Sequence, residues 1–194
     1  RDLHYPLRRQ RQMCIRDSQL IYSKSIKGKN IVRLKGGDPF IFGRGGEEIR
    51  YLQKRFIKVE VTPGITSAFG AASNTLIPFT QRGVSSSVAF CTGHPEAKLV
   101  IPKADTIVCY MSASNLQLVV SKIIESGREE STPIAIIRNV SLPDQEVHIS
   151  TLGRIIESNA YFASPIIVIV GDVVGINNYI DPEFKTHQTK VQTP

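Results

Sequence analysis

The sequence lacks most of the features that mark metal-binding, secreted and membrane-spanning proteins. Its three cysteines, Cys14, Cys91 and Cys109, form no CxxC pair. An odd and scattered set argues against a structural metal site and favours a reducing compartment. The longest apolar stretch, around residues 165–170, is too short to span a bilayer. No apolar core region follows the arginine-rich start, so we expect no secretory signal. These absences predict a cytoplasmic protein that binds no metal and no membrane.

The chain is basic, with 24 Lys and Arg against 17 Asp and Glu and a formal net charge of +7. A basic surface suits an anionic partner such as a nucleic acid, a phosphate or a polycarboxylate. A solvated cationic face explains the same charge equally well. Because the aromatic residues are scattered and no recognition motif is found, we do not expect nucleic acid to be the partner.

Short segments rich in β-branched residues alternate with segments of helical period, which predicts an α/β architecture with largely parallel sheets. Gly127 stands where the carboxyl-terminal cap of the helix predicted over 115–126 belongs. Helices are predicted after Gly45-Gly46 (with Ile49, Leu52 and Phe56 on one face), over 115–126 and over 152–158. Strands are predicted over 30–34, 57–61, 85–92, 105–111, 133–138, 146–150 and 165–170.

The chain is expected to divide near residue 83, because residues 80–83 form a polar, glycine-ended joint between two strand–helix groups. Residues 18–82 would then form an amino-terminal α/β lobe and residues 83–180 a carboxyl-terminal one. Residues 1–17 are arginine-rich and show neither helical nor strand period, so we interpret them as a disordered basic arm or, preferably, as foreign sequence. Residues 181–194 show no periodicity and are expected to form a loose tail.

The strongest motif is the run Val-Arg-Leu-Lys-Gly-Gly-Asp-Pro-Phe-Ile-Phe-Gly-Arg-Gly-Gly-Glu-Glu at residues 32–48. Gly36 and Gly37 let a backbone approach a ligand without Cβ interference, and Pro39 restricts the direction of Asp38. An isolated Gly-Gly-Asp is as often only a tight turn. The run is neither a Walker loop nor a dinucleotide fingerprint, because it lacks Gly-Lys-Ser/Thr and the GxGxxG spacing.

At this length the run closely resembles the signature of the uroporphyrinogen-III C-methyltransferases. Related precorrin methylases carry a shorter Gly-Asp-Pro-Ser pattern, so the longer run favours the uroporphyrinogen enzymes. Two positions depart from the family pattern: Gln81, where His is more frequent, and Val140, where a glycine often approaches the cofactor. The resemblance extends over about residues 19–174, through further runs at 61–68, 77–83, 91–94, 108–111, 137–141 and 164–174.

The resemblance implies a two-lobed tetrapyrrole methylase-like fold with S-adenosyl-L-methionine bound in the cleft between the lobes. It implies three substrate-wall residues, Arg44, Arg82 and His94. It implies no metal. The residues that it assigns to the cofactor are Gly36, Gly37, Asp38, Ile41, Thr66, Ser67, Met111 and Val140.

The implied reaction is the transfer of two methyl groups to uroporphyrinogen III, which gives precorrin-2 for sirohaem or cobalamin. This substrate is a polycarboxylate, which suits a basic chain, and the family tends to form homodimers. The family's first strand, with Gly-Pro-Gly-Asp-Pro, and its acid–base loop are not found in the sequence, so no catalytic residue is assigned. We therefore expect an incomplete first lobe and impaired activity. The alternatives are a non-catalytic cofactor-binding fragment and a methylase that acts on a later precorrin.

Overall fold

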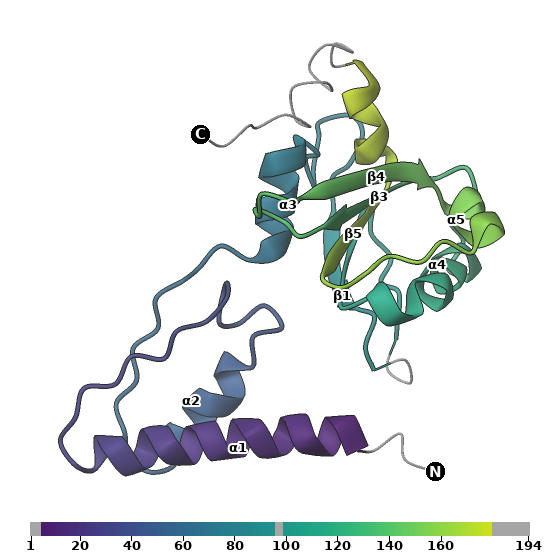
Figure 1. Ribbon diagram of the computed structural model, residues 1–194. Coiled ribbons are helices and arrows are strands. Elements are labelled where there is room, and N and C mark those ends of the chain that lie inside the picture. Colours follow the sequence, from purple (N-terminus) through teal and green to yellow (C-terminus); the bar gives the residue numbers. More distant parts are fainter. Residues whose placement is uncertain (1–4, 96–98, 180–194) are drawn as a thin grey trace. The chain divides into compact units, whose positions relative to one another are not determined.

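The computed structural model describes the backbone of residues 5–95 and 99–179 and the side chains of 15–95 and 99–176 (Figure 1). Contacts within the chain divide it into two compact units, Arg1–Thr66 and Ser67–Pro194. The division falls before the expected joint at residues 80–83. The physical reason is that Phe79 belongs to the aromatic packing of the second unit, with its ring 5.6 Å from Phe69 and 5.7 Å from Phe90.

The second unit contains one five-stranded sheet with the order β1-β2-β5-β3-β4. The α/β class is thereby confirmed, but the expectation of largely parallel sheets is wrong. Only β1 and β2 pair in parallel, whereas β5 pairs antiparallel with both β2 and β3, and β3 pairs antiparallel with β4. A connection of seven residues joins β3 to β4, too short for a parallel crossover. The strands are β1 (Val88–Thr92), β2 (Thr106–Tyr110), β3 (Pro133–Arg138), β4 (Glu146–Thr151) and β5 (Ile166–Val170).

Helices cover both faces of this sheet, with α4 and α5 on one face and α3 on the other (Figure 1). The predicted helices over 115–126 and 152–158 are confirmed, and Gly127 takes a φ of 101° just beyond α4. The elements are α3 (Ser67–Thr75), α4 (Leu116–Glu125), α5 (Leu152–Ser158) and the 3-10 helices η2 (Ala113–Asn115) and η3 (Asp172–Tyr179).

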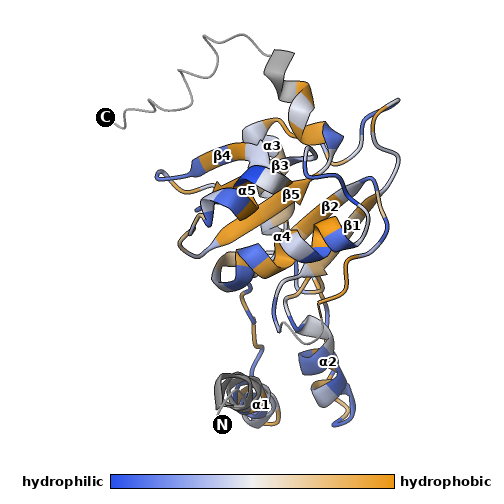
Figure 2. Ribbon diagram, turned by 90° about the vertical axis from the view of Figure 1, so that its right-hand side faces the viewer, coloured by the Kyte–Doolittle hydropathy of each residue, from blue (hydrophilic) through white to orange (hydrophobic). Residues whose placement is uncertain are grey.

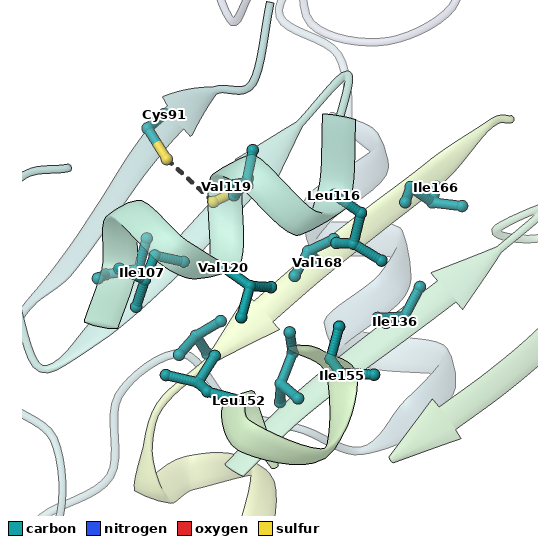
Figure 3. Close-up of a cluster of buried hydrophobic side chains, with 14 residues drawn as sticks. Cys91, Ile107, Leu116, Val119, Val120, Ile136, Leu152, Ile155, Ile166 and Val168 are labelled. Carbon is teal, nitrogen blue, oxygen red and sulfur yellow. Dashed lines mark hydrogen bonds between the residues drawn. The ribbon is translucent and has the colours of Figure 1, made fainter. Parts of the chain in front are cut away.

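The core of the second unit lies between the sheet and helices α4 and α5 (Figure 3). Strand β5 is buried along its whole length, and the hydropathy colouring shows it apolar from end to end (Figure 2). Cys91 and Cys109 face each other in register on β1 and β2, with their sulfur atoms 3.1 Å apart. Both are free thiols. The hydrogen bond with Cys91 and then burial raise the pKa of Cys109. Both cysteines belong to the buried apolar cluster of this unit.

The described part of the first unit contains two helices, α1 (Tyr5–Ser25) and α2 (Gly45–Gln53). Helix α2 confirms the helix predicted after Gly45-Gly46, although Phe56 lies beyond its end. The expectation that residues 1–17 lack regular structure is wrong for residues 5–17, which are helical. Good helix formers (Leu, Arg and Gln) fill positions 7–12, and Pro6 lies in the first turn, where its missing N–H is not needed.

The strands predicted at 30–34 and 57–61 are wrong, because neither segment forms a ladder in the described part of the chain. A strand needs a hydrogen-bonded partner, and β-branched composition alone does not supply one. The apolar side chains of the first segment are accordingly exposed, Val32 by 82% and Leu34 by 81%.

Two further expectations concern the ends of the chain and the membrane. The loose tail predicted at residues 181–194 lies outside the described residues. Over the described ranges, no helix combines the length and the apolar character needed to cross a membrane.

Candidate functional site

The loop that joins Lys35 to α2 folds back on itself around Pro39. The backbone N–H of Gly45 donates to the carbonyl oxygen of Pro39 at 2.9 Å. A Cβ on Gly45 would lie 2.6 Å from that oxygen, and a Cβ on Gly43 would lie 2.7 Å from it. Real Cβ atoms do not approach a carbonyl so closely, so only glycine fits at these two positions.

A second segment, residues 63–66, packs backbone against backbone on this loop. A Cβ on Gly64 would lie 2.8 Å from the carbonyl oxygen of Gly37, and a Cβ on Gly37 would lie 3.3 Å from that of Ile65. Gly36 differs, because a Cβ there would meet no atom within 4 Å. The two predicted cofactor segments of this unit are therefore in contact, and Gly36 leaves backbone exposed beside them.

The carboxylate of Asp38 links the two segments. Its Oδ1 accepts a hydrogen bond from the N–H of Phe40 at 2.8 Å, and its Oδ2 accepts one from the N–H of Gly64 at 3.2 Å. The bond from Phe40, then that from Gly64, and a weaker one from Ile41 lower the pKa of Asp38, so the group is ionised at neutral pH.

Arg44 lies at the start of α2 and is engaged by a neighbouring carboxylate. Its Nε and Nη2 donate to Glu47 Oε1 and Oε2 at 3.1 and 2.6 Å, a bidentate pair. The predicted substrate-wall cation is thus partly neutralised within its own helix turn. The first unit gathers six of the predicted site residues along one loop system: Gly36, Gly37, Asp38, Ile41, Arg44 and Thr66.

The second unit gathers a different set at one edge of its sheet. Strands β1 and β2 run in parallel, and β3 runs the same way, because β5 is antiparallel to both β2 and β3. Their carboxyl ends therefore meet at a single edge. Predicted residues follow each of these ends: His94 after β1, Met111 after β2 and Val140 after β3.

The segment after β1 is held closely to the segment after β2. The N–H of Gly93 donates to the carbonyl of Tyr110 at 2.8 Å, and a Cβ on Gly93 would lie 2.7 Å from Ser112 Oγ. The side-chain amide of Asn115 donates to the carbonyl of Gly93. Met111 is 47% exposed at this edge and takes a positive φ of 54°. The sequence did not point to Asn115, whose signal is a polar residue just before the apolar helix α4.

The backbone of His94 is fixed by its neighbour Thr92. Thr92 Oγ1 accepts a hydrogen bond from the His94 N–H at 3.2 Å and donates one to the His94 carbonyl at 2.8 Å. The exposed imidazole therefore stands on a defined turn.

Val140 packs against helix α3 rather than standing alone. A Cβ on Gly70 would lie 3.3 Å from Val140 Cγ1 and 3.2 Å from Ser141 Oγ. The amide of Asn74 donates to Ser141 Oγ at 2.9 Å. Ser67 begins this same helix, so the unit brings Ser67 and Val140 to elements that touch each other.

Arg82 lies elsewhere in the second unit. It belongs to a turn closed by hydrogen bonds between Gln81 and Ser85. The hydroxyl of Ser85 lies 2.9 Å from that of Thr106, the first residue of β2. This is the amino-terminal end of the strand, opposite the end that leads to Met111. The structure therefore does not bring Arg82 together with His94 and Met111.

Apart from Arg82, the predicted site residues fall into two groups, one in each unit. The first is defined by the loop system of residues 35–48 and 63–66, and the second by the carboxyl-terminal sheet edge and helix α3. That the two groups line one cleft stays a prediction.

Comparison with known protein families gives a match over most of the chain. The sequence profile of the tetrapyrrole (corrin/porphyrin) methylases matches residues 10–156. This match includes residues 10–17, which we expected to fall outside the family.

Several curated proteins are similar to the chain. A siroheme synthase of Saccharophagus degradans is 46% identical over 167 residues, which cover 81% of this chain and 36% of that protein. A uroporphyrinogen-III C-methyltransferase of Synechocystis is 42% identical over 168 residues, covering 81% of this chain and 64% of that protein. The chain thus spans about a third of the synthase and just under two thirds of the methyltransferase.

Solved structures show the same likeness. The crystal structure of uroporphyrin-III-C-methyltransferase from Thermus thermophilus gives a TM-score of 0.78 at 36% identity, covering 85% of this chain and 74% of that one. A second structure of the Thermus enzyme, in complex with S-adenosyl homocysteine, gives a TM-score of 0.74 at 28% identity and covers 82% of this chain and 73% of that one. A cobalt precorrin-4 methyltransferase, at 21% identity and a TM-score of 0.69, shares the fold.

Proposed function

This chain belongs to the tetrapyrrole (corrin/porphyrin) methylases, and on that premise we propose that it binds S-adenosyl-L-methionine for the C-methylation of uroporphyrinogen III. The product would be precorrin-2, a precursor of sirohaem and cobalamin. The names of the similar proteins support this substrate, since they include siroheme synthases and a uroporphyrinogen-III C-methyltransferase.

One observation carries the proposal: the contact between residues 36–46, which we call the glycine loop, and the segment of residues 63–66. Two backbones pack with no room for side chains, and Gly36 beside them leaves open space in which a ligand can reach the main chain. Asp38 stays ionised in the same loop, and its negative charge suits a cofactor that carries sulfonium and ammonium groups. The residues present therefore fit the cofactor that the family implies.

The charge distribution supports a polycarboxylate substrate. Of the 24 Lys and Arg, 15 lie in residues 1–66, together with only 6 of the 17 Asp and Glu. The excess positive charge thus belongs to the unit that holds the glycine loop, and residues 67–194 are slightly acidic. A basic unit raises the local concentration of an anionic substrate.

The chemical demand on the protein is mainly geometric. The sulfonium of the cofactor supplies an activated methyl group. The chain therefore has to bind cofactor and substrate, align the methyl group with the reacting carbon and exclude water around that carbon. We assign this alignment to the glycine loop and to the edge with Gly93 and Met111. We assign no residue to proton removal, because the family's acid–base motif is not among the matched runs.

Two finer assignments belong to the same proposal. We place the protein in the cytoplasm, since its scattered cysteines suit a reducing compartment. We also infer a homodimer, which rests on the tendency of the family alone.

Calorimetric titration of the 194-residue chain with S-adenosyl-L-methionine tests the proposal, with Gly37→Val as the key variant. A valine at this position would meet the Ile65 carbonyl and occupy ligand space, so binding should be lost while the circular dichroism of the sheet persists. Failure of the unaltered chain to bind, or unchanged affinity in the variant, would contradict the cofactor assignment.

A separate assay for precorrin-2 distinguishes an enzyme from a binding protein. Uroporphyrinogen III and the cofactor are incubated with the chain, and the product is detected by its absorption after oxidation. Product formation supports the methylase. Tight cofactor binding without product would instead favour the non-catalytic alternative.

A further inference from the structure

An ion pair between a buried carboxylate and a largely buried ammonium joins the two ends of the glycine loop. Glu48 of α2 is 6% exposed, and its Oε2 lies 2.6 Å from the Nζ of Lys35, whose side chain is 17% exposed. Lys35 immediately precedes Gly36, and Glu48 follows the second glycine pair. The two charges therefore stand at the two ends of the loop that we assign to the cofactor.

The ammonium group of Lys35 has a second partner. It donates a hydrogen bond to the carbonyl oxygen of Gly43 at 3.0 Å. Gly43 lies on the returning arm of the loop, where no side chain is tolerated. The ammonium of Lys35, at the start of the loop, thus contacts both Gly43 near the end of the loop and Glu48 on helix α2.

The other carboxylate oxygen of Glu48 has weaker interactions. Its Oε1 is buried and accepts no hydrogen bond within the described residues, and the Nε of Arg33 lies 3.5 Å from it. Arg33 is itself half exposed and paired with Asp17 of α1 at 3.0 Å. Glu48 therefore depends chiefly on Lys35 to offset the cost of burying its charge.

A buried ion pair is a poor way to gain stability, since apolar side chains of similar volume often serve as well or better. What an apolar pair cannot do is donate a hydrogen bond to Gly43. The geometry points to a specific use for the charges, namely the shape of the loop.

We propose that Lys35 and Glu48 are positioning residues that hold the glycine loop in its ligand-binding shape. Glu48 orients the ammonium, and the ammonium fixes the carbonyl of Gly43 and with it the turn around Pro39. The consequence for S-adenosyl-L-methionine affinity rests on the proposed function.

Three variants of the full chain test this inference: Lys35→Met, Glu48→Gln and the apolar double variant Lys35→Met/Glu48→Leu. The control variants are Lys58→Met and Glu60→Gln, which break a pair in the same unit whose side chains are 87% and 82% exposed. The readouts are amide hydrogen exchange of residues 36–46 without ligand, thermal stability, and affinity for S-adenosyl-L-methionine.

Each single variant should speed exchange in the loop and lower the affinity by roughly tenfold, the scale of one charge-assisted hydrogen bond. The control variants should change neither quantity. The double variant is decisive, because it removes both buried charges together. Its stability should recover while its loop exchange stays fast and its affinity stays low, since Gly43 still lacks its donor.

Recovery of affinity along with stability in the double variant would overturn the inference, because the pair would then be only structural. Unchanged loop exchange in Lys35→Met would also overturn it. If the unaltered chain binds no S-adenosyl-L-methionine, the proposed function fails and the affinity claim fails with it. Loop exchange still decides, in that case, whether Lys35 and Glu48 hold the loop.

Discussion

The two units of the chain hold their backbones by different means. The second unit has a five-stranded sheet whose central strand β5 is buried from Ile166 to Val170. The first unit has no strand in its described part, and Leu52 is its only apolar side chain under a tenth exposed among those described. Its loop is held instead by glycine contacts, by the Asp38 carboxylate and by the ion pair of Lys35 with Glu48.

This difference shows that a signature motif and a hydrophobic core depend on different interactions. The glycine loop is built from contacts within residues 35–48 and between that segment and residues 63–66, and these contacts need no sheet. The sheet of the second unit needs pairings over long separations, such as Ile107 with Val170. A motif can therefore keep its local geometry in a unit that buries little apolar surface, because hydrogen bonds and close backbone packing specify its shape.

The largest expected effect comes from a cavity in the core of the second unit. Ile136 is 1% exposed, so Ile136→Ala should reduce the free energy of unfolding by about 2–5 kcal/mol. The matched variant in the first unit is Leu34→Ala, whose side chain is 81% exposed and whose loss should change stability by no more than about 0.5 kcal/mol. Urea denaturation followed by circular dichroism measures both. Equal losses would mean that the two units are stabilised alike, contrary to the comparison.

A smaller effect is expected where two backbones touch in the first unit. Gly64→Ala places a Cβ 2.8 Å from the Gly37 carbonyl, so the segments must separate and S-adenosyl-L-methionine affinity should fall by roughly tenfold or more. Gly46→Ala is the control for the same chemical change, since its Cβ meets no protein atom within 4 Å and Gly46 is not assigned to the cofactor. Hydrogen exchange of β1 to β5 should not change in either variant. A spread of faster exchange into the sheet would show that the loop and the core are not energetically separate.

The smallest effect concerns two carboxylates, one in each unit, that accept hydrogen bonds from nearby backbone N–H groups. Asp105 accepts hydrogen bonds from the backbone and hydroxyl of Ser86 and from the backbone of Ser87, which lower its pKa from 3.8 to about 2. The pKa of Asp38 is lowered in the same way by Phe40 and Gly64. A lowered pKa means that each carboxylate contributes stability fully above pH 3.8 and loses it as the pH falls toward its folded value.

Thermal melting between pH 5 and pH 2 of the variants Asp105→Asn and Asp38→Asn tests the contribution of these two carboxylates to stability. Each variant should melt below the unaltered chain at pH 5, and the gap should close as the pH approaches 2. A gap that stays constant with pH would show that packing, and not the charge of the carboxylate, fastens these turns.

Prediction from the sequence succeeded where neighbouring residues decide the structure. The helices α2, α4 and α5 followed from apolar periodicity, and the cap at Gly127 followed from glycine's tolerance of positive φ. The contact of the two glycine segments is consistent with the motif order, since both had been assigned to one ligand. The prediction failed for the strands at 30–34 and 57–61, because β-branched composition does not reveal whether a partner strand is present.

For the candidate site, the sequence pointed to residues but not to their roles. Asp38 was predicted to face the cofactor, and its carboxylate also joins two loops through Phe40 and Gly64. Arg82 belongs to a matched motif, and yet its turn lies at the opposite end of β2 from Met111. Asn115, Lys35 and Glu48 were not singled out, because their importance lies in burial and in partners that only folding brings near.

The sequence by itself determined the family, the helices α2, α4 and α5 and the glycine positions, since these depend on residue type and on spacing along a few turns of chain. The tertiary structure alone decided the antiparallel place of β5, the edge shared by His94, Met111 and Val140, and the pairing of Lys35 with Glu48 and Gly43. The physical reason is that the free energy of strand pairing and of a buried charge depends on which distant groups come into contact, and local sequence carries no record of those contacts.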